Sequence, residues 1–289
     1  MKLLLVGHLS LDVIHDPDGS EHEEAGGLFR ALATLSSTGG RTDKFLVVAG
    51  AGKKEAPAIR ERLATLPGVE TDGIFATETP VHRIHYYFRN TEDFVECTNE
   101  LASPIPFTRI RPHLNGADGI LINMISGVDI TLDTLDEIRM AVRNDGIPIH
   151  LDMHSLTLGV NDRNERFRRP LVDWRRWAFM IDTVQMNDEE LGGLTEELMS
   201  EHQAVGHMLT LGVKGVIVTR GRKGASVYVN EHKKVARTDI PGSENGNIVS
   251  PIGRGDVFGA AFFHHYVKNH DLIAAARHAH AVAAAPGTA

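Results

Sequence analysis

The most informative stretch of the chain is Gly253-Arg254-Gly255-Asp256, which an apolar run over residues 257–263 follows at once. Two glycines allow the backbone to turn tightly, and the apolar run predicts a helix that begins just after the turn. The unpaired N–H groups at the start of a helix, together with the helix dipole, favour an anion. An aspartate there suits a base that takes a proton from a hydroxyl attacking a phosphoryl group, although an N-cap role explains it equally well.

Upstream of this turn, short apolar runs alternate with longer amphipathic ones, which is the pattern of strand–helix units on a mostly parallel sheet. We therefore expect a three-layer α/β/α fold in one domain over residues 1–289, with a central, mostly parallel sheet. The expected strands are 3–6, 45–48, 120–125, 147–153, 183–186 and 216–219, followed by a hairpin of 225–229 and 234–240. The expected helices are 27–35, 57–66, 131–143, 196–209, 257–268 and 272–285.

Two segments depart from this alternation. Residues 74–76, 81–88 and 94–98 have strand character with no helix between them, and 89–93 form the turn, so we expect a small antiparallel lid. Exposed apolar residues on this lid, such as Tyr87 and Phe94, would pair two subunits in a homodimer. Residues 12–24 hold six acids and no lysine or arginine, and a solvated acidic loop is the simplest interpretation.

The composition excludes several classes of protein. The chain has 289 residues with 30 Lys and Arg against 38 Asp and Glu, and the net charge of −8 argues against binding to nucleic-acid phosphates. Six arginines and two tryptophans over residues 163–177 are expected on a solvated helix face. The lone Cys97 forbids an internal disulfide and, with no apolar run of about 20 residues, indicates a cytoplasmic protein without a membrane segment.

Further candidate sites follow other strands. Glycines and bases in Thr219-Arg220-Gly221-Arg222-Lys223-Gly224 suit a ligand crevice at the carboxyl end of a strand, or a tight connection between two strands. The pair Gly26-Gly27 begins the first helix. Asn187 and Glu190 follow the strand at 183–186, where they would orient a metal-bound water or a phosphate; in the alternative, Asp188 and Glu189 simply cap a helix.

Sixteen histidines raise the question of a metal site. His150 and His154 are four residues apart, but their strand-like context keeps them off a shared helical face. No carboxylate completes a ligand set around the other histidine pairs. We expect all of them to be surface or core histidines.

Taken in chain order, these pieces resemble the PfkB/ribokinase family of carbohydrate kinases. The family signature D-T-x-G-A-G-D-x-F aligns with Ser250-Pro251-Ile252-Gly253-Arg254-Gly255-Asp256-Val257-Phe258. The N-x-x-E motif matches Asn187 to Glu190, and the V-T-x-G-x-x-G motif matches residues 218–224. The opening G-x-x-x-x-D matches Gly7 to Asp12, and a Gly-Gly pair matches Gly26-Gly27. The resemblance spans nearly the whole chain, and the family's lid strands would correspond to residues of about 8–25 and 74–100.

This resemblance implies an ATP- and Mg²⁺-dependent kinase that phosphorylates a hydroxymethyl group of a sugar or sugar-like molecule. Asp256 would be the catalytic base, and the backbone N–H groups of Gly253, Arg254 and Gly255 would form the anion hole. The remaining roles are implied by position: Asp12, Gly26, Gly27 and Arg30 for the acceptor, Asn187, Thr219, Gly221 and Gly224 for the nucleotide, and Glu190 for Mg²⁺ through a water. The family also includes nucleoside kinases, and a catalytically weak nucleotide- or sugar-binding regulatory protein is a further alternative.

Four departures from the family pattern bear on these expectations. Ser250-Pro251 replaces Asp-Thr, which removes a carboxylate near the phosphates and the associated cation site. Arg254 replaces an alanine, where it would add positive charge at the transition state, recognise an anionic substrate or pair with an acid. Arg30 stands near the place where an amide is expected at the sugar. Family members often continue past Pro286-Gly287, so we expect a reduced adenine pocket.

Overall fold

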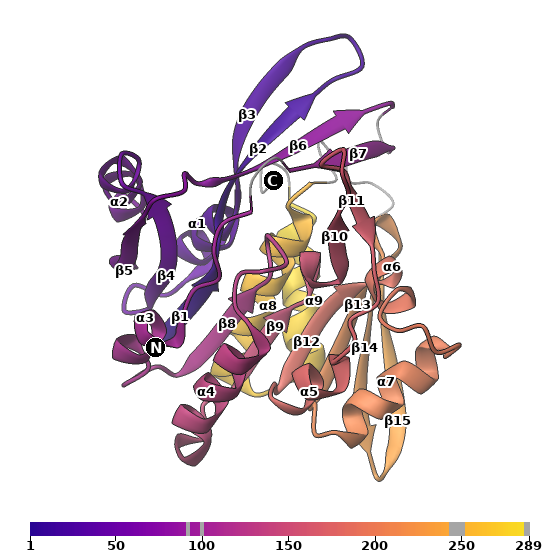
Figure 1. Cartoon of the computed structure of the whole chain (residues 1–289). Helices are drawn as coiled ribbons and strands as arrows, with labels where there is room; N and C mark the ends of the chain where they lie inside the picture. Colours follow the sequence, from indigo (N-terminus) through magenta and orange to yellow (C-terminus); the bar gives the residue numbers. More distant parts are fainter. Residues whose placement is uncertain (91–92, 99–100, 243–251, 286–289) are drawn as a thin grey trace.

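The fold is built on a large central sheet (Figure 1). The computed structural model describes residues 1–90, 93–98, 101–242 and 252–285, and within them this sheet has nine strands in the order β15-β14-β13-β12-β9-β8-β1-β4-β5. Neighbouring strands from β13 to β5 are parallel, and β14 and β15 add an antiparallel edge. The strands are β1 (Lys2–Gly7), β4 (Lys44–Gly52), β5 (Val69–Thr77), β8 (Gly119–Asn123), β9 (Ile149–Asp152), β12 (Thr183–Asn187), β13 (Gly215–Thr219), β14 (Gly224–Glu231) and β15 (Lys234–Pro241).

Helices cover both faces of this sheet, and the inner strands are therefore apolar at nearly every position. One face packs against α4 (Leu132–Val142), α5 (Trp174–Phe179) and α7 (Glu201–Thr210), and the other against α1 (Leu28–Thr38), α8 (Arg254–Asn269) and α9 (Leu272–Ala283). Shorter pieces are α2 (Ala56–Ala64), α3 (Phe107–Ile110), α6 (Asp188–Gly192) and the 3-10 turns Arg111–His113, Arg143–Asp145, His154–Thr157 and Gly221–Lys223. The predicted three-layer α/β/α architecture is confirmed. In the described ranges, no helix has the length and apolar character needed to cross a bilayer.

A second, four-stranded sheet lies above one end of the main sheet and forms a lid (Figure 1). Its strands are β2 (Leu9–His15), β3 (Glu21–Gly27), β6 (His82–Phe88) and β7 (Phe94–Cys97), in the order β3-β2-β6-β7. Side chains alternate between the two faces of these strands, so that Ser10, Asp12 and Ile84 share the face turned toward the main sheet. The lid is mixed rather than purely antiparallel, because β2 and β6 run parallel.

The first connection from the main sheet to the lid is a single residue, His8, because β1 ends at Gly7 and β2 begins at Leu9. His8 is buried, and its backbone N–H donates to Oδ1 of Asp129 at 2.7 Å. Its ring nitrogens lie 2.9 Å from the hydroxyl of Ser126 and 3.1 Å from the carbonyl of Ser103. The connection between the two sheets is therefore fixed by contacts on three sides.

Two expectations for the lid are wrong in part. The 74–76 run belongs to β5, which pairs in parallel with β4 at the edge of the main sheet and is no part of the lid. The acidic segment 12–24 is no solvated loop, because most of it forms β2 and β3. Its acids are compatible with a strand because β3 is an edge strand of the lid and carries Glu21 and Glu23 on exposed positions.

The arginine-rich segment 163–177 also differs from the expected solvated helix face. It contains the strand β11 (Arg166–Arg168), which pairs with β10 (Leu158–Val160), and then α5. Both tryptophans of α5, Trp174 and Trp177, are buried in the core. The predicted helix at 196–209 begins later, at Glu201, where Ser200 and Gln203 form a capping box.

Candidate active site

Asp256 lies in the first turn of α8, at the end of the main sheet where the parallel strands terminate. It is only 3% exposed. Asn123, the last residue of β8, donates its side-chain N–H to Oδ1 of Asp256 at 2.8 Å. The N-cap of α8 is Gly253 and no side chain caps this helix, so the N-cap role considered for Asp256 is not what the structure shows.

Of the two glycines at the start of α8, Gly253 and Gly255, only Gly253 is required by its backbone conformation and its surroundings. Gly253 has φ +79°, and a Cβ there would lie 2.3 Å from Cδ of Arg30. Gly255 is different, because a Cβ there would meet nothing closer than the side chain of Gln185 at 3.7 Å. Gln185 donates instead to the carbonyl of Gly255 at 2.9 Å, which ties the start of α8 to the middle of the sheet.

A small pocket joins Asp256 to the lid. Its lining consists of Ser10, Asp12, Gly27, Arg30, Ile84, Tyr86, Ile125, His154, Ile252, Gly253 and Asp256. Five of the residues predicted from the sequence for the base, the anion hole and the acceptor therefore meet at one place: Asp256, Gly253, Asp12, Gly27 and Arg30.

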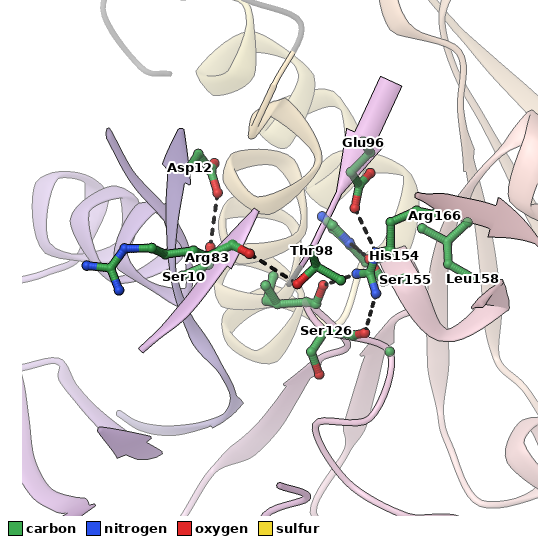
Figure 2. A network of polar contacts seen from close by, with 12 residues as sticks. Ser10, Asp12, Arg83, Glu96, Thr98, Ser126, His154, Ser155, Leu158 and Arg166 are labelled. Carbon is green, nitrogen blue, oxygen red and sulfur yellow. Dashed lines mark hydrogen bonds and ion pairs between the residues drawn. The ribbon is translucent and has the colours of Figure 1, made fainter. Parts of the chain in front are cut away.

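A buried ion pair between Arg30 and Asp12 spans the pocket. The second guanidinium nitrogen of Arg30 lies 3.2 Å from Glu24, and the hydroxyl of Ser10 donates to Asp12 at 3.2 Å (Figure 2). Burial raises the pKa of Asp12 even though Arg30 opposes that change. Burial also disfavours the charge of Arg30, but Asp12 and Asp256 outweigh it and raise the pKa of the guanidinium.

The Gly26-Gly27 pair makes room for this ion pair. A Cβ on Gly26 would lie 2.2 Å from Oδ1 of Asp12, so any larger residue would displace the carboxylate. Gly27 has φ +55° and forms the turn from β3 into α1, which carries Arg30. The Asp12 carboxylate therefore requires Gly26, and the turn from β3 into α1 requires Gly27.

The residues assigned to the nucleotide lie at the ends of the next strands. Asn187, at the end of β12, pairs in register with Thr219 at the end of β13. Asn187 and Glu190 form a reciprocal capping box on α6, in which both carboxylate oxygens of Glu190 accept from Asn187 at 2.9 Å. A helix cap is present here, but Asn187 and Glu190 form it rather than Asp188 and Glu189, and burial raises the pKa of Glu190.

Gly221 and Gly224 lie in the turn between β13 and β14, and both have positive φ. A Cβ on Gly224 would be 2.0 Å from the carbonyl of Ile240, so this glycine is required by strand packing. A Cβ on Gly221 would meet nothing within 4 Å, which leaves open space above the turn.

Arg254 has no acid partner in the part of the chain that the structure describes, so the proposed structural ion pair is not seen there. Its Nε is buried without a hydrogen bond to any described residue. Burial and the nearby Arg222 lower the pKa of Arg254, and Arg254 in turn contributes to a lowered pKa of His280. Three basic groups from separate segments thus gather near the start of α8. Ser250, Pro251, Pro286 and Gly287 lie outside the described residues.

Three polar residues in or at the ends of the central strands were not predicted as site residues from the sequence. Asn123 and Asp152 end the neighbouring strands β8 and β9, and Gln185 of β12 pairs in register with Asp152. His154, expected to be an ordinary surface or core histidine, lines the pocket beside Asp256. A polar side chain at the carboxyl end of a buried strand is the sequence signal for Asn123, and a predicted strand of 120–125 hides this signal because it runs past the true strand end.

The C-terminal part of the chain matches a known protein family. A model of the pfkB family carbohydrate kinases matches residues 160–286. Ribokinase from Arabidopsis thaliana is 30% identical over 130 residues, which cover 44% of this chain and 30% of that protein. The chain therefore matches less than a third of the length of this relative.

Two solved structures resemble nearly the whole chain. A pyrophosphate-dependent kinase in the ribokinase family has a TM-score of 0.77 at 18% identity, covering 98% of this chain and 94% of that chain. Aminoimidazole riboside kinase from Salmonella enterica, complexed with aminoimidazole riboside and an ATP analog, has a TM-score of 0.76 at 16% identity, covering 100% and 94%. The chain has the ribokinase fold, and the resemblance to the PfkB/ribokinase family is confirmed.

The Arg30–Asp12 pair predicts a measurable stability effect. Arg30→Met leaves Asp12 buried without its cation, and we expect the free energy of unfolding to fall by about 3 kcal/mol or more in urea denaturation. The double variant Arg30→Met/Asp12→Asn should recover most of this loss, because no uncompensated buried charge remains. Arg89→Met, which breaks the exposed pair with Asp93, is the control and should cost less than about 1 kcal/mol. Equal losses for Arg30→Met and the control would show that the buried pair does not stabilise the fold.

Proposed function

We propose that this protein is an ATP-dependent kinase that phosphorylates a hydroxymethyl group of a sugar or sugar-like molecule. The observation that carries the proposal is the buried carboxylate of Asp256, which lies in the first turn of α8 and faces a pocket closed by lid residues. A base at that point is adjacent both to an acceptor bound under the lid and to the helix N-terminus that attracts a phosphoryl group.

Asp256 is the proposed base that accepts the proton of the attacking hydroxyl. Asn123 occupies Oδ1 of the carboxylate, and no described residue hydrogen-bonds to Oδ2. Oδ2 is therefore the oxygen available to the acceptor hydroxyl, while Asn123 holds the orientation of the carboxylate. The acceptor would lie against Asp12, Gly26, Gly27 and Arg30.

The first turn of α8 is the proposed anion hole. The N–H groups of the residues that follow Gly253 have no partner within the helix, and the dipole of this 16-residue helix adds to their attraction for the transferred phosphoryl group. Charge stabilisation by preorganised donors is the main task of an enzyme in phosphoryl transfer. Gly253, Arg254 and Gly255 form this turn.

The phosphoryl donor would bind over the ends of β12 and β13, against Asn187, Thr219, Gly221 and Gly224. Mg²⁺, when bound, would neutralise the donor phosphates. Glu190 fits an indirect role through water, because both of its carboxylate oxygens already accept from Asn187. In the described residues, no three His, Cys, Asp or Glu side chains are grouped to hold a metal without the donor.

A competition experiment would identify the phosphoryl donor and the acceptor. The similar structures include a pyrophosphate-dependent kinase and an aminoimidazole riboside kinase, so ATP and pyrophosphate should be compared as donors, with ribose-like sugars and nucleosides as acceptors. A product with nucleosides alone would favour the nucleoside kinase alternative. Stabilisation by ATP with no product across the panel would favour a regulatory binding protein.

Asp256→Asn tests the proposed base. We expect ATP-dependent phosphorylation to fall by about 10²–10⁴-fold, because the amide cannot accept the proton of the hydroxyl. The melting temperature should change little, since Asn keeps the size of the side chain and Asn123 can still bond to its oxygen. Asp133→Asn, on an exposed face of α4, is the matched control. Turnover equal to that of the control would refute the assignment of Asp256.

Arg254→Ala restores the residue that the family signature carries at this position, and tests whether the guanidinium serves the donor. We expect the KM for the donor to rise and kcat to fall, while the melting temperature stays the same or increases because repulsion by Arg222 is removed. Arg254→Lys should recover part of the activity. Arg41→Ala, at an exposed position, is the control. Unchanged kinetics in Arg254→Ala would assign Arg254 no part in donor binding.

A homodimer through the lid strands is the proposed assembly. Tyr87 is 44% exposed on β6 and stacks on His15 of β2. Phe94, the other residue considered, is partly buried against Tyr86 and Phe88 and does not offer an exposed surface. We expect sedimentation to show a dimer that Tyr87→Lys dissociates, whereas Phe179→Lys on α5 leaves it intact. A monomeric wild-type protein would contradict this assembly.

A further inference from the structure

His154 has an unusual backbone for its residue type. It directly follows β9 and Met153 and begins the 3-10 turn His154–Thr157 with φ +36°. Residues with a Cβ are disfavoured in this left-handed region, which Gly and Asn occupy more readily. Strained backbone of this kind is often found at functional sites. The left-handed backbone therefore marks His154 as a candidate functional residue.

The side chain of His154 lines the pocket that contains Asp256, Asp12 and Arg30. Its Nδ1 lies 2.9 Å from the hydroxyl of Ser155, the next residue (Figure 2). In the described part of the chain, no residue hydrogen-bonds to the other ring nitrogen, Nε2. One nitrogen is thus held by the turn and the other remains available to a ligand.

Carboxylates on four elements contribute to the electrostatic environment of His154. Asp256 belongs to α8, Asp152 to β9, Glu190 to α6 and Glu96 to β7. Burial disfavours the charged ring, but these carboxylates outweigh it and raise the pKa of His154. Asp152 and Asp256 make no ion pair with any described lysine or arginine, and burial raises the pKa of Asp152 well above its ordinary value.

The nearby arginines already have partners. Arg166 lies 3.0 Å from Glu96 (Figure 2), Arg30 pairs with Asp12 and Glu24, and Arg168 lies 4.0 Å from Glu190. A phosphoryl group that enters this pocket meets the charges of Asp256 and its carboxylate neighbours. Among the basic side chains of the pocket lining, Arg30 is paired with Asp12, whereas no described carboxylate lies within ion-pair distance of the His154 ring.

We propose that His154 contacts the phosphoryl group during its transfer, and is thus a further catalytic residue. The proposal rests on the proposed kinase function. It follows from the location of His154 between the lid pocket, where the acceptor binds, and Glu190, on the side of the donor. The protonated Nε2–H donates to a phosphoryl oxygen as negative charge moves from donor to acceptor.

His154→Asn is the main test. Asn tolerates the left-handed backbone but carries no charge, so we expect an unchanged or higher melting temperature together with a fall in kcat of about 10²-fold. KM for the acceptor should stay close to the wild-type value, because the lost contact is made mainly in the transition state. In the wild type kcat should fall as pH rises through the raised pKa of His154, and this decrease should be absent in the variant.

His232→Asn is the matched control, because His232 is also a histidine with a left-handed backbone, at φ +52° in the β14–β15 turn, far from the pocket lining. It should change the melting temperature in the same direction and leave kcat and its pH profile unaltered. A kcat of His154→Asn equal to that of this control would overturn the proposal. A large loss of stability in His154→Asn, with the alkaline decrease retained, would assign His154 a structural role and also overturn it.

A second measurement separates this proposal from the proposed function. If Asp256→Asn abolishes phosphorylation and His154→Asn does not reduce it, the inference fails and the kinase function stands. If the wild type forms no product, the histidine ring signals should be followed by NMR while inorganic phosphate is added. A shift of the His154 signals, identified by their absence in His154→Asn, supports phosphate contact, and no shift overturns it.

Discussion

The candidate site depends on the buried ion pair between Arg30 and Asp12. Arg30 comes from α1, Asp12 from lid strand β2, and the guanidinium packs directly against Gly253, where α8 begins. Two side chains from the first 30 residues therefore locate the lid and α1 relative to the start of α8, which lies more than 200 residues later in the chain. A buried charge pair of this kind is weak evidence for stability in itself, but removing one partner is costly, so the arrangement of lid, helix and pocket is held as a unit.

Local patterns predicted most of the main sheet and its helices, because burial on both faces produces continuous apolar strands that amphipathic helices separate. The same reasoning failed for β3, because its acids lie on an edge strand and resemble a solvated loop. It also failed for Asn123 and His154. A strand end is poorly defined in a single sequence, and their importance arises from Asp256, which lies more than a hundred residues away in the chain.

The glycines of the site have different structural roles, although the sequence motifs contain them alike. Gly26 makes room for a carboxylate, Gly224 for a neighbouring carbonyl and Gly253 for a guanidinium. Gly255 and Gly221 face no such contact, so a side chain there would fit the surroundings in the described structure. The spacing in the sequence indicated a turn beside a ligand, but only the three-dimensional packing separates the glycines that the fold requires from those that leave space.

The connection through His8 determines how the lid can move. Since only one buried residue separates β1 from β2, and its backbone and ring are bonded to Asp129, Ser126 and Ser103, this joint is stiff. A stiff joint does not act as a hinge, and an opening motion has to be absorbed by bending along β2 and β6 instead. We therefore expect any displacement of the lid to be largest at the β2–β3 turn, which is farthest from His8 along β2, and smaller at Asp12.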